Sequence, residues 1–140
     1  AQVSLEAVRA SVLKLRARKG MVIDENDPDS VSCGSFFTNP IVSDRVARGL
    51  PDDAPKYESE EDDGLTVKLS AAWLIENAGI EKGFRIAGSR AAISSKHTLA
   101  IVNTGGATAT EILQLAEYVQ VRVSNKFGIN LVPEPNLIGF

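Results

Sequence analysis

The chain has 140 residues, of which 44% are apolar, and this length and apolar content suffice for one domain with one hydrophobic core. The net charge of −3 and the pI near 5.2 argue against a nucleic-acid-binding surface, which normally carries an excess of basic residues. We expect no membrane span, because no apolar run reaches ~18 residues, and the single cysteine, which cannot form an internal disulfide, favours a cytoplasmic protein.

The first predicted element is a helix that begins after Ser4, a residue type that commonly caps helices. Four apolar residues recur on one face of this helix: Leu5, Val8, Val12 and Leu15. Its last turns are basic, and cations suit the negative end of a helix dipole, so Lys19 has a structural explanation that requires no ligand. Residues 1–3 show neither an initiator methionine nor a signal-peptide pattern, and we interpret this start as a cut made just before a helix.

The next part of the chain alternates short ordered segments with polar connections. We expect extended segments or strands over 21–23 and 36–42, a polar turn over 24–29, a short helix from Ser43 to about Gly49, and a loop over 51–64. The loop contains the acidic run 58–63 but lacks the donor spacing and central glycine of a calcium loop, so we predict no metal site there. Tyr57 in this loop either folds over a ligand or packs against the protein.

The second half of the chain gives clearer signals. The expected elements are strands over 65–69, 85–93, 99–102 and 129–132, a helix over 71–78 capped by Ser70 and ended by Gly79, and turns over 94–97 and 103–106. The clearest helix begins at the capping box of Thr108 and Glu111 and ends at Gly128. Its apolar stripe comprises Ile112, Leu115, Ala116, Val119, Val123 and Phe127. Strands and helices without a sustained strand–helix–strand repeat favour an α+β fold, with a single antiparallel sheet and helices packed on it.

The segment Cys33-Gly34-Ser35-Phe36-Phe37-Thr38-Asn39-Pro40 places a serine hydroxyl beside a flexible glycine and next to two large aromatic rings. Asn39 offers an amide donor and acceptor, and Pro40 biases it toward an extended conformation. This pattern is suited to a hydroxyl that reacts with or contacts a ligand. The same residues also fit a core strand that ends in a turn, with Ser35 capping a backbone group.

Several familiar catalytic sites do not fit the sequence. One histidine and one cysteine, without Cys-x-x-Cys or His-Glu-x-x-His spacing, argue against zinc. The residues around Ser35 lack the Gly-x-Ser-x-Gly pattern of a nucleophile elbow, which argues against a hydrolase of that class. His97, after Ser95 and Lys96, is either a general base or anion ligand, or a turn histidine bonded to the backbone.

Five segments, in order along nearly the whole chain, match one pattern. They are 16–19 (Arg-Ala-Arg-Lys), 34–40 (Gly-Ser-Phe-Phe-Thr-Asn-Pro), 67–76 around Trp73, Ser95-Lys96-His97 with Val102-Asn103, and 131–139 (Leu-Val-Pro-Glu-Pro-Asn-Leu-Ile-Gly). Together they resemble the UDP-N-acetylenolpyruvoylglucosamine reductases, the bacterial flavoenzymes that make UDP-N-acetylmuramate for peptidoglycan. The long connection over 43–64 is similar to the longer-loop subclass of this family.

The resemblance implies that residues 1–140 are the C-terminal substrate-binding and catalytic domain, and that the N-terminal FAD-binding domains are absent from this chain. We therefore expect the chain to hold no FAD tightly and to be inactive without those domains. The implied activity is that of an NADPH-dependent FAD oxidoreductase acting on UDP-N-acetylglucosamine enolpyruvate. Such an enzyme is a cytoplasmic monomer of cell-wall biogenesis, and serves cell shape and cell division.

The resemblance also implies roles for individual residues. Ser35 matches the family's proton donor, and Glu134 matches its acidic residue beside the enolpyruvyl group. Lys19, Asn39 and His97 match positions that contact the diphosphate and uridine of the substrate, and Tyr57 is a further substrate-binding residue. The chain departs from some members at Asn136, where they have arginine, so any contact of that arginine is not carried over.

Two alternatives to the reductase domain remain at this point. A non-catalytic nucleotide-sugar binding module would retain Lys19, Asn39 and His97 but would not need both Ser35 and Glu134. An unrelated structural or interaction domain, with Ser35 bonded to the protein, would have no affinity for UDP.

Overall fold

The computed structural model describes residues 3–59 and 65–139. In chain order the elements are α1 (Leu5–Ala17), the short 3-10 helix η1 (Pro28–Ser30), β1 (Ser32–Ser35), β2 (Ile41–Ser43), α2 (Asp44–Arg48), β3 (Lys56–Glu58), β4 (Thr66–Leu69), α3 (Ala71–Asn77), β5 (Ala91–Ile93), β6 (Ala100–Asn103) and α4 (Ala109–Phe127). This arrangement confirms the predicted α+β class. None of the helices within the described ranges is long and apolar enough to cross a membrane.

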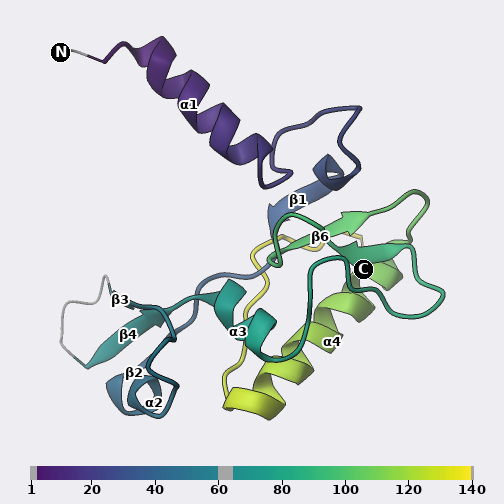
Figure 1. The fold of residues 1–140 in the computed structure, drawn as a ribbon. Helices are drawn as coiled ribbons and strands as arrows, with labels where there is room; N and C mark the ends of the chain where they lie inside the picture. Colours follow the sequence, from purple (N-terminus) through teal and green to yellow (C-terminus); the bar gives the residue numbers. More distant parts are fainter. Residues whose placement is uncertain (1–2, 60–64, 140) are drawn as a thin grey trace.

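The strands form two small antiparallel sheets, so the prediction of a single sheet is wrong. The first has the order β1-β6-β5 and the second the order β2-β4-β3 (Figure 1). The chain leaves the first sheet because, after Ser35, its hydrogen bonds pass to the C-terminal tail: Phe37 forms an isolated bridge with Pro133. Pro40 then separates this segment from β2, since proline has no N–H to donate. The expected strand over 36–42 is therefore reduced to β2.

Other predicted segments also differ from the structure. The chain over 129–132 is not a strand; it is held by burial of Ile129 and Leu131 and by Gln120, whose Nε2 donates to the Leu131 carbonyl at 2.8 Å. The expected strand over 85–93 is confined to β5, because the chain turns at Gly88, where φ is +80°. The predicted loop over 51–64 contains β3, and its residues 60–64 lie outside the described part of the chain.

The core lies between α4, α3 and the first sheet, as Figure 1 shows. The predicted stripe of α4 supplies side chains with no exposed surface, among them Leu115, Val119 and Val123. Leu74 and Ile75 of α3 are equally buried. The predicted caps at Ser4 and Ser70 and the capping box of Thr108 and Glu111 are confirmed, and Ser43 also caps a helix, α2; each satisfies an N–H group at a helix start.

Helix α1 has a different environment from the other long helix. It extends away from the body of the domain (Figure 1), and none of its residues is buried. Its apolar face is open, with Leu5 88% and Leu15 57% exposed. After α1, the chain turns at Gly20 with φ +67°, where its Cα lies against Asp29 of η1. This contact anchors the end of α1 to the domain.

Candidate functional site

The segment 33–40 lies where β1, β6 and the C-terminal tail meet. Ser35, the last residue of β1, is paired with Ala100 of β6, and the Phe36 N–H donates to the Leu99 carbonyl at 2.7 Å. On its other side the Phe36 carbonyl accepts from the Glu134 N–H at 2.9 Å. The structure therefore places Ser35 and Glu134 on hydrogen-bonded neighbouring segments. These two positions are 99 residues apart in sequence.

The two phenylalanines of this segment are buried. Phe36 and Phe37 are both 2% exposed and their rings meet edge to face at 5.3 Å. Gly34 has φ +82°, a conformation that favours glycine. Ser35 is half-buried, and its hydroxyl has no hydrogen-bond partner within the described ranges. The interpretation of Ser35 as a backbone cap is therefore not supported by its contacts.

The charge of Glu134 reaches the β1 segment although the residue itself is exposed. Partial burial, and then the negative charge of Glu134, raise the pKa of the Cys33 thiol. A carboxylate thus lies close enough to the end of β1 to act electrostatically on groups there.

Asn39 has a structural contact that the sequence did not predict. Its Oδ1 accepts a hydrogen bond from the Ala71 N–H at 2.9 Å, at the first residue of α3. The Ser70 side chain satisfies a second N–H at the same helix start, that of Trp73, at 3.2 Å. Asn39 is exposed. Because its Oδ1 already bonds to the backbone, the NH₂ group is the part of this amide that it would offer to a ligand.

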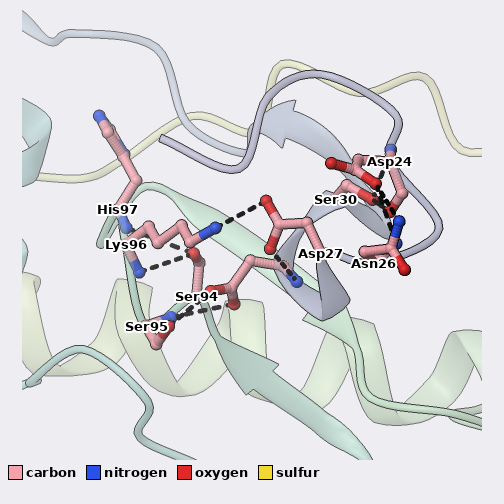
Figure 2. A network of polar contacts seen from close by, with 9 residues as sticks. Asp24, Asn26, Asp27, Ser30, Ser94, Ser95, Lys96 and His97 are labelled. Carbon is pink, nitrogen blue, oxygen red and sulfur yellow. Dashed lines mark hydrogen bonds and ion pairs between the residues drawn. The ribbon is translucent and has the colours of Figure 1, made fainter. Parts of the chain in front are cut away.

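The turn over 94–97 holds His97 in one orientation. The buried Ser94 hydroxyl accepts from the N–H groups of Lys96 at 3.0 Å and His97 at 3.3 Å. The His97 Nδ1 accepts from the Leu99 N–H at 3.1 Å, which assigns the ring proton to Nε2 in the neutral form. Figure 2 shows the His97 side chain directed away from the Asp27–Lys96 pair.

His97 lies in a positive environment. Its pKa is lowered first by burial and then by the charges of Lys19 and Lys82, while Glu76 acts in the opposite direction. Lys19, which follows the end of α1, thus lies near enough to His97 for its charge to act on the imidazole. Lys82 joins them, and sequence reasoning missed it, because a lysine before a turn glycine carries no distinctive signal.

A surface hollow of about 430 Å³ adjoins this cluster. It is lined by Glu76, Ile80, Glu81, Lys82 and Thr98. The Thr98 hydroxyl donates to Glu76 at 3.1 Å and so holds that carboxylate at the floor of the hollow. Lys82 lines the hollow beside the carboxylates of Glu76 and Glu81, whereas Lys19 and His97 are not among its lining residues. The two lysines and the imidazole N–H are the groups of this region that can bind an anion such as a diphosphate.

Tyr57 lies on β3 of the second sheet, opposite Lys68, and is 51% exposed. The structure does not join it by a hydrogen bond to the other predicted site residues in the described part of the chain. Among the residues described, there is also no group of three or more His, Cys, Asp or Glu side chains placed to hold a metal ion.

Comparisons with known proteins identify the family of the chain. The sequence profile described as "UDP-N-acetylenolpyruvoylglucosamine reductase, C-terminal domain" matches residues 27–138. Relatives named UDP-N-acetylenolpyruvoylglucosamine reductase include those of Leifsonia xyli (55% identical, covering 99% of this chain and 43% of the relative) and Mycobacterium tuberculosis (50% identical, covering 96% and 38%). A solved reductase structure of this name from Thermus caldophilus is 28% identical, covers 94% of this chain and 34% of its own, and gives a TM-score of 0.48.

The chain spans about two fifths of the length of the curated relatives that it matches. The profile nevertheless covers most of the chain, from the residue before η1 to Ile138 in the C-terminal tail. The chain therefore belongs to the UDP-N-acetylenolpyruvoylglucosamine reductase family and contains its C-terminal domain.

Proposed function

We propose that this chain is the substrate-binding and proton-donating part of an enzyme that reduces UDP-N-acetylglucosamine enolpyruvate to UDP-N-acetylmuramate. The observation that carries the proposal is the uncommitted Ser35 hydroxyl on a segment hydrogen-bonded to that of Glu134. FAD reduced by NADPH supplies the hydride in this proposal. We assign the binding of both to the N-terminal part of the complete protein, because the matched profile is that of a C-terminal domain.

The role proposed for Ser35 is to protonate the α-carbon after a hydride reaches the β-carbon of the enolpyruvyl ether. A serine hydroxyl is a very weak acid in water, so it can act as a general acid only toward a strongly basic centre such as this carbanion or enolate. Its position at the end of a paired strand, above two buried rings, fixes where the proton is delivered. Glu134 relays a proton or shapes the charge that develops beside Ser35.

We assign the diphosphate and uridine to the side of the site that carries the positive charge. Lys19 and Lys82 supply compact cations, and the Nε2–H of His97 supplies a donor. The Asn39 amide offers its two N–H groups, and Tyr57 adds a contact from the second sheet. The substrate would then extend from the cation cluster to Ser35, whose strand partner Ala100 lies three residues after His97.

The open face of α1 supports the further proposal that the partner of this domain is the N-terminal part of the same protein. The family profile begins after α1, whereas the relatives match the chain across it. Leu5, Val8, Val12 and Leu15 would be covered by that part, since an exposed apolar stripe of this kind normally marks a contact surface. We place this enzyme in the cytoplasm as a monomer.

The test of the ligand assignment is titration of the isotopically labelled chain with UDP, followed by amide chemical shifts. Perturbations should centre on Lys19, Lys82 and His97, and the affinity should be weak because one wall of the cleft is missing. Lys19→Ala should weaken binding by roughly five- to tenfold, whereas Lys126→Ala, an equal charge change on α4, should leave it unchanged. Shifts confined to residues 51–59, or none at all, would contradict the assignment.

A second comparison separates the reductase from the non-catalytic binding module. Both predict affinity for UDP, but only the reductase requires Ser35 and Glu134. In the complete protein, Ser35→Ala should leave the affinity for UDP unchanged and abolish most turnover. Unchanged turnover would favour the binding module.

A further inference from the structure

Asp29 occupies an unusual position for a carboxylate. It lies in η1 and is only 7% exposed. Its Oδ1 accepts from the Ser95 N–H at 3.1 Å, and its Oδ2 accepts from the Ser95 hydroxyl. A buried carboxylate is stable only when hydrogen bonds of this kind replace the water it has lost. Both bonds cross from η1 to the turn that carries His97, so Asp29 ties together segments 66 residues apart.

A second tether reinforces the first. The Asp27 Oδ2 pairs with Lys96 Nζ at 2.7 Å, as Figure 2 shows. Asp27, the N-cap of η1, also accepts from the Asp29 N–H at 3.1 Å and so orients the backbone of Asp29. The ion pair, followed by this backbone contact, holds the pKa of Asp27 below its usual value, although burial acts against the shift. Ser95 and Lys96 thus both bond to η1 and its N-cap, whereas the half-buried His97 side chain makes neither of these bonds.

The opposite side of Asp29 contacts the corner that follows α1. A β-carbon added at Gly20 would lie 2.9 Å from the Asp29 Cβ and 3.1 Å from its carbonyl oxygen. No other residue type fits there without a shift, and the φ of +67° also favours glycine. Gly20 is adjacent to Lys19. Asp29 therefore lies between Gly20, the residue after Lys19, and the turn that carries His97.

We propose that Asp29 is a positioning residue of the anion subsite, which fixes the Ser95–His97 run against the Gly20 corner so that the Lys19 ammonium and the His97 Nε2–H group face one ligand. This inference rests on the proposed function for the identity of the ligand. Asp29 does not touch the ligand. It holds the turn over 94–97 and the corner at Gly20 in place before the ligand binds. Less conformational entropy is then lost on binding, and the affinity is higher.

The test uses Ser95→Ala, because Ser95 is exposed and its replacement leaves the buried carboxylate with the Ser95 N–H as a donor. With UDP as the probe, Ser95→Ala should raise the dissociation constant about tenfold, as expected for loss of one hydrogen bond to a charged group. Ser95→Thr retains the hydroxyl and should recover to within about threefold of wild type. The matched control is Ser89→Ala, which loses a hydrogen bond to the Ala91 N–H at the other end of β5 and should leave the constant unchanged.

Two further readouts separate positioning from a general effect on stability. Ser95→Ala should weaken UDP binding much less in a His97→Ala background, because positioning acts through His97. It should also accelerate amide hydrogen exchange at Lys96 and His97, whose N–H groups are held by Ser94 within this turn. The exchange measurement requires no ligand.

The outcomes distinguish this inference from the proposed function. If wild type binds UDP and Ser95→Ala binds it equally well, or loses the same factor in both backgrounds, Asp29 has no positioning role and the proposed function stands. If wild type does not bind UDP, the ligand assignment fails. Accelerated exchange at Lys96 and His97 in Ser95→Ala would then still support the positioning role of Asp29, and unchanged exchange would overturn that role as well.

Discussion

Asn39 offers the sharpest separation between a structural and a ligand-binding role. Its Oδ1 accepts from the Ala71 N–H at 2.9 Å, and Ala71 has no exposed surface. Asn39→Ala leaves this buried donor without a partner, which costs about 1–3 kcal/mol of the free energy of unfolding. Asn39→Asp keeps the acceptor and adds a negative charge at the start of α3, which is worth about 0.3–1 kcal/mol in favour of the folded state.

The two substitutions should therefore differ in their effect on stability, whereas both remove the amide N–H donors and should weaken UDP binding. With a urea slope of about 2 kcal/mol per molar, Asn39→Ala should lower the unfolding midpoint by roughly 0.5–1.5 M, and Asn39→Asp should leave it equal or slightly higher. The new carboxylate lacks the N–H donors of the amide and repels a diphosphate, so Asn39→Asp should weaken UDP binding about fivefold or more.

Urea unfolding at constant slope measures the first effect, and UDP titration under conditions where every variant is folded measures the second. If Asn39→Asp binds UDP as wild type does, Asn39 is a structural cap of α3 and not a ligand residue. If Asn39→Ala is as stable as wild type, the hydrogen bond to Ala71 does not carry the energy assigned to it.

Two predictions concern pH. His97 is the only histidine, so its ring proton signal reports one pKa. This pKa should lie below that of an unperturbed histidine, and Lys19→Ala and Lys82→Ala should each raise it; an unchanged value in both variants would contradict the cation cluster. Hydrogen bonds from the Thr108 and Arg90 N–H groups lower the pKa of Glu111 from 4.5 to about 2, so its stabilising contribution is complete above pH 4.5 and is lost as the pH falls toward 2. Glu111→Gln should flatten the dependence of unfolding free energy on pH in that window, and an equal slope in both proteins would refute this role.

The helix starts were predictable because each depends on contacts within three residues. The side chains of Ser4, Ser43, Ser70 and Thr108 each accept from an N–H three residues further on, and such spacings are visible in the sequence. The buried stripe of α4 was predictable for a similar reason, since its period follows from helix geometry. Local hydrogen bonding and periodicity therefore account for most of the confirmed elements.

The division into two sheets was not predictable from local pattern, because it depends on distant partners. The backbone groups of Phe36 and Thr38, on either side of Phe37, bond to the C-terminal tail instead of continuing along β6, and nothing near residue 37 indicates this choice. The second role of Asn39 likewise depends on Ala71, 32 residues away. Lys82 and Asp29 became visible only when the fold placed them beside His97 and Ser95.

The arrangement of the candidate site also depends on contacts between residues that are distant in sequence. The sequence resemblance named Ser35, Glu134, Lys19, Asn39, His97 and Tyr57, and their assignment to substrate remains a proposal. The fold relates Ser35 to Glu134 through the backbone of Phe36, and Lys19 to His97 through charge. It places Tyr57 on the other sheet, opposite Lys68.

The most direct test of the central claim is rapid-mixing absorbance of the flavin in the complete protein carrying this domain, with Ser35→Ala and Ser35→Cys compared to wild type. Reduction by NADPH should proceed within about twofold of wild type in both variants, because Ser35 has no part in that half-reaction. Reoxidation by the enolpyruvyl substrate should be slower by about 10²- to 10⁴-fold in Ser35→Ala, and Ser35→Cys, which keeps a transferable proton, should recover part of the rate. Reoxidation of Ser35→Ala within about twofold of wild type would contradict the assignment of Ser35 as the proton donor.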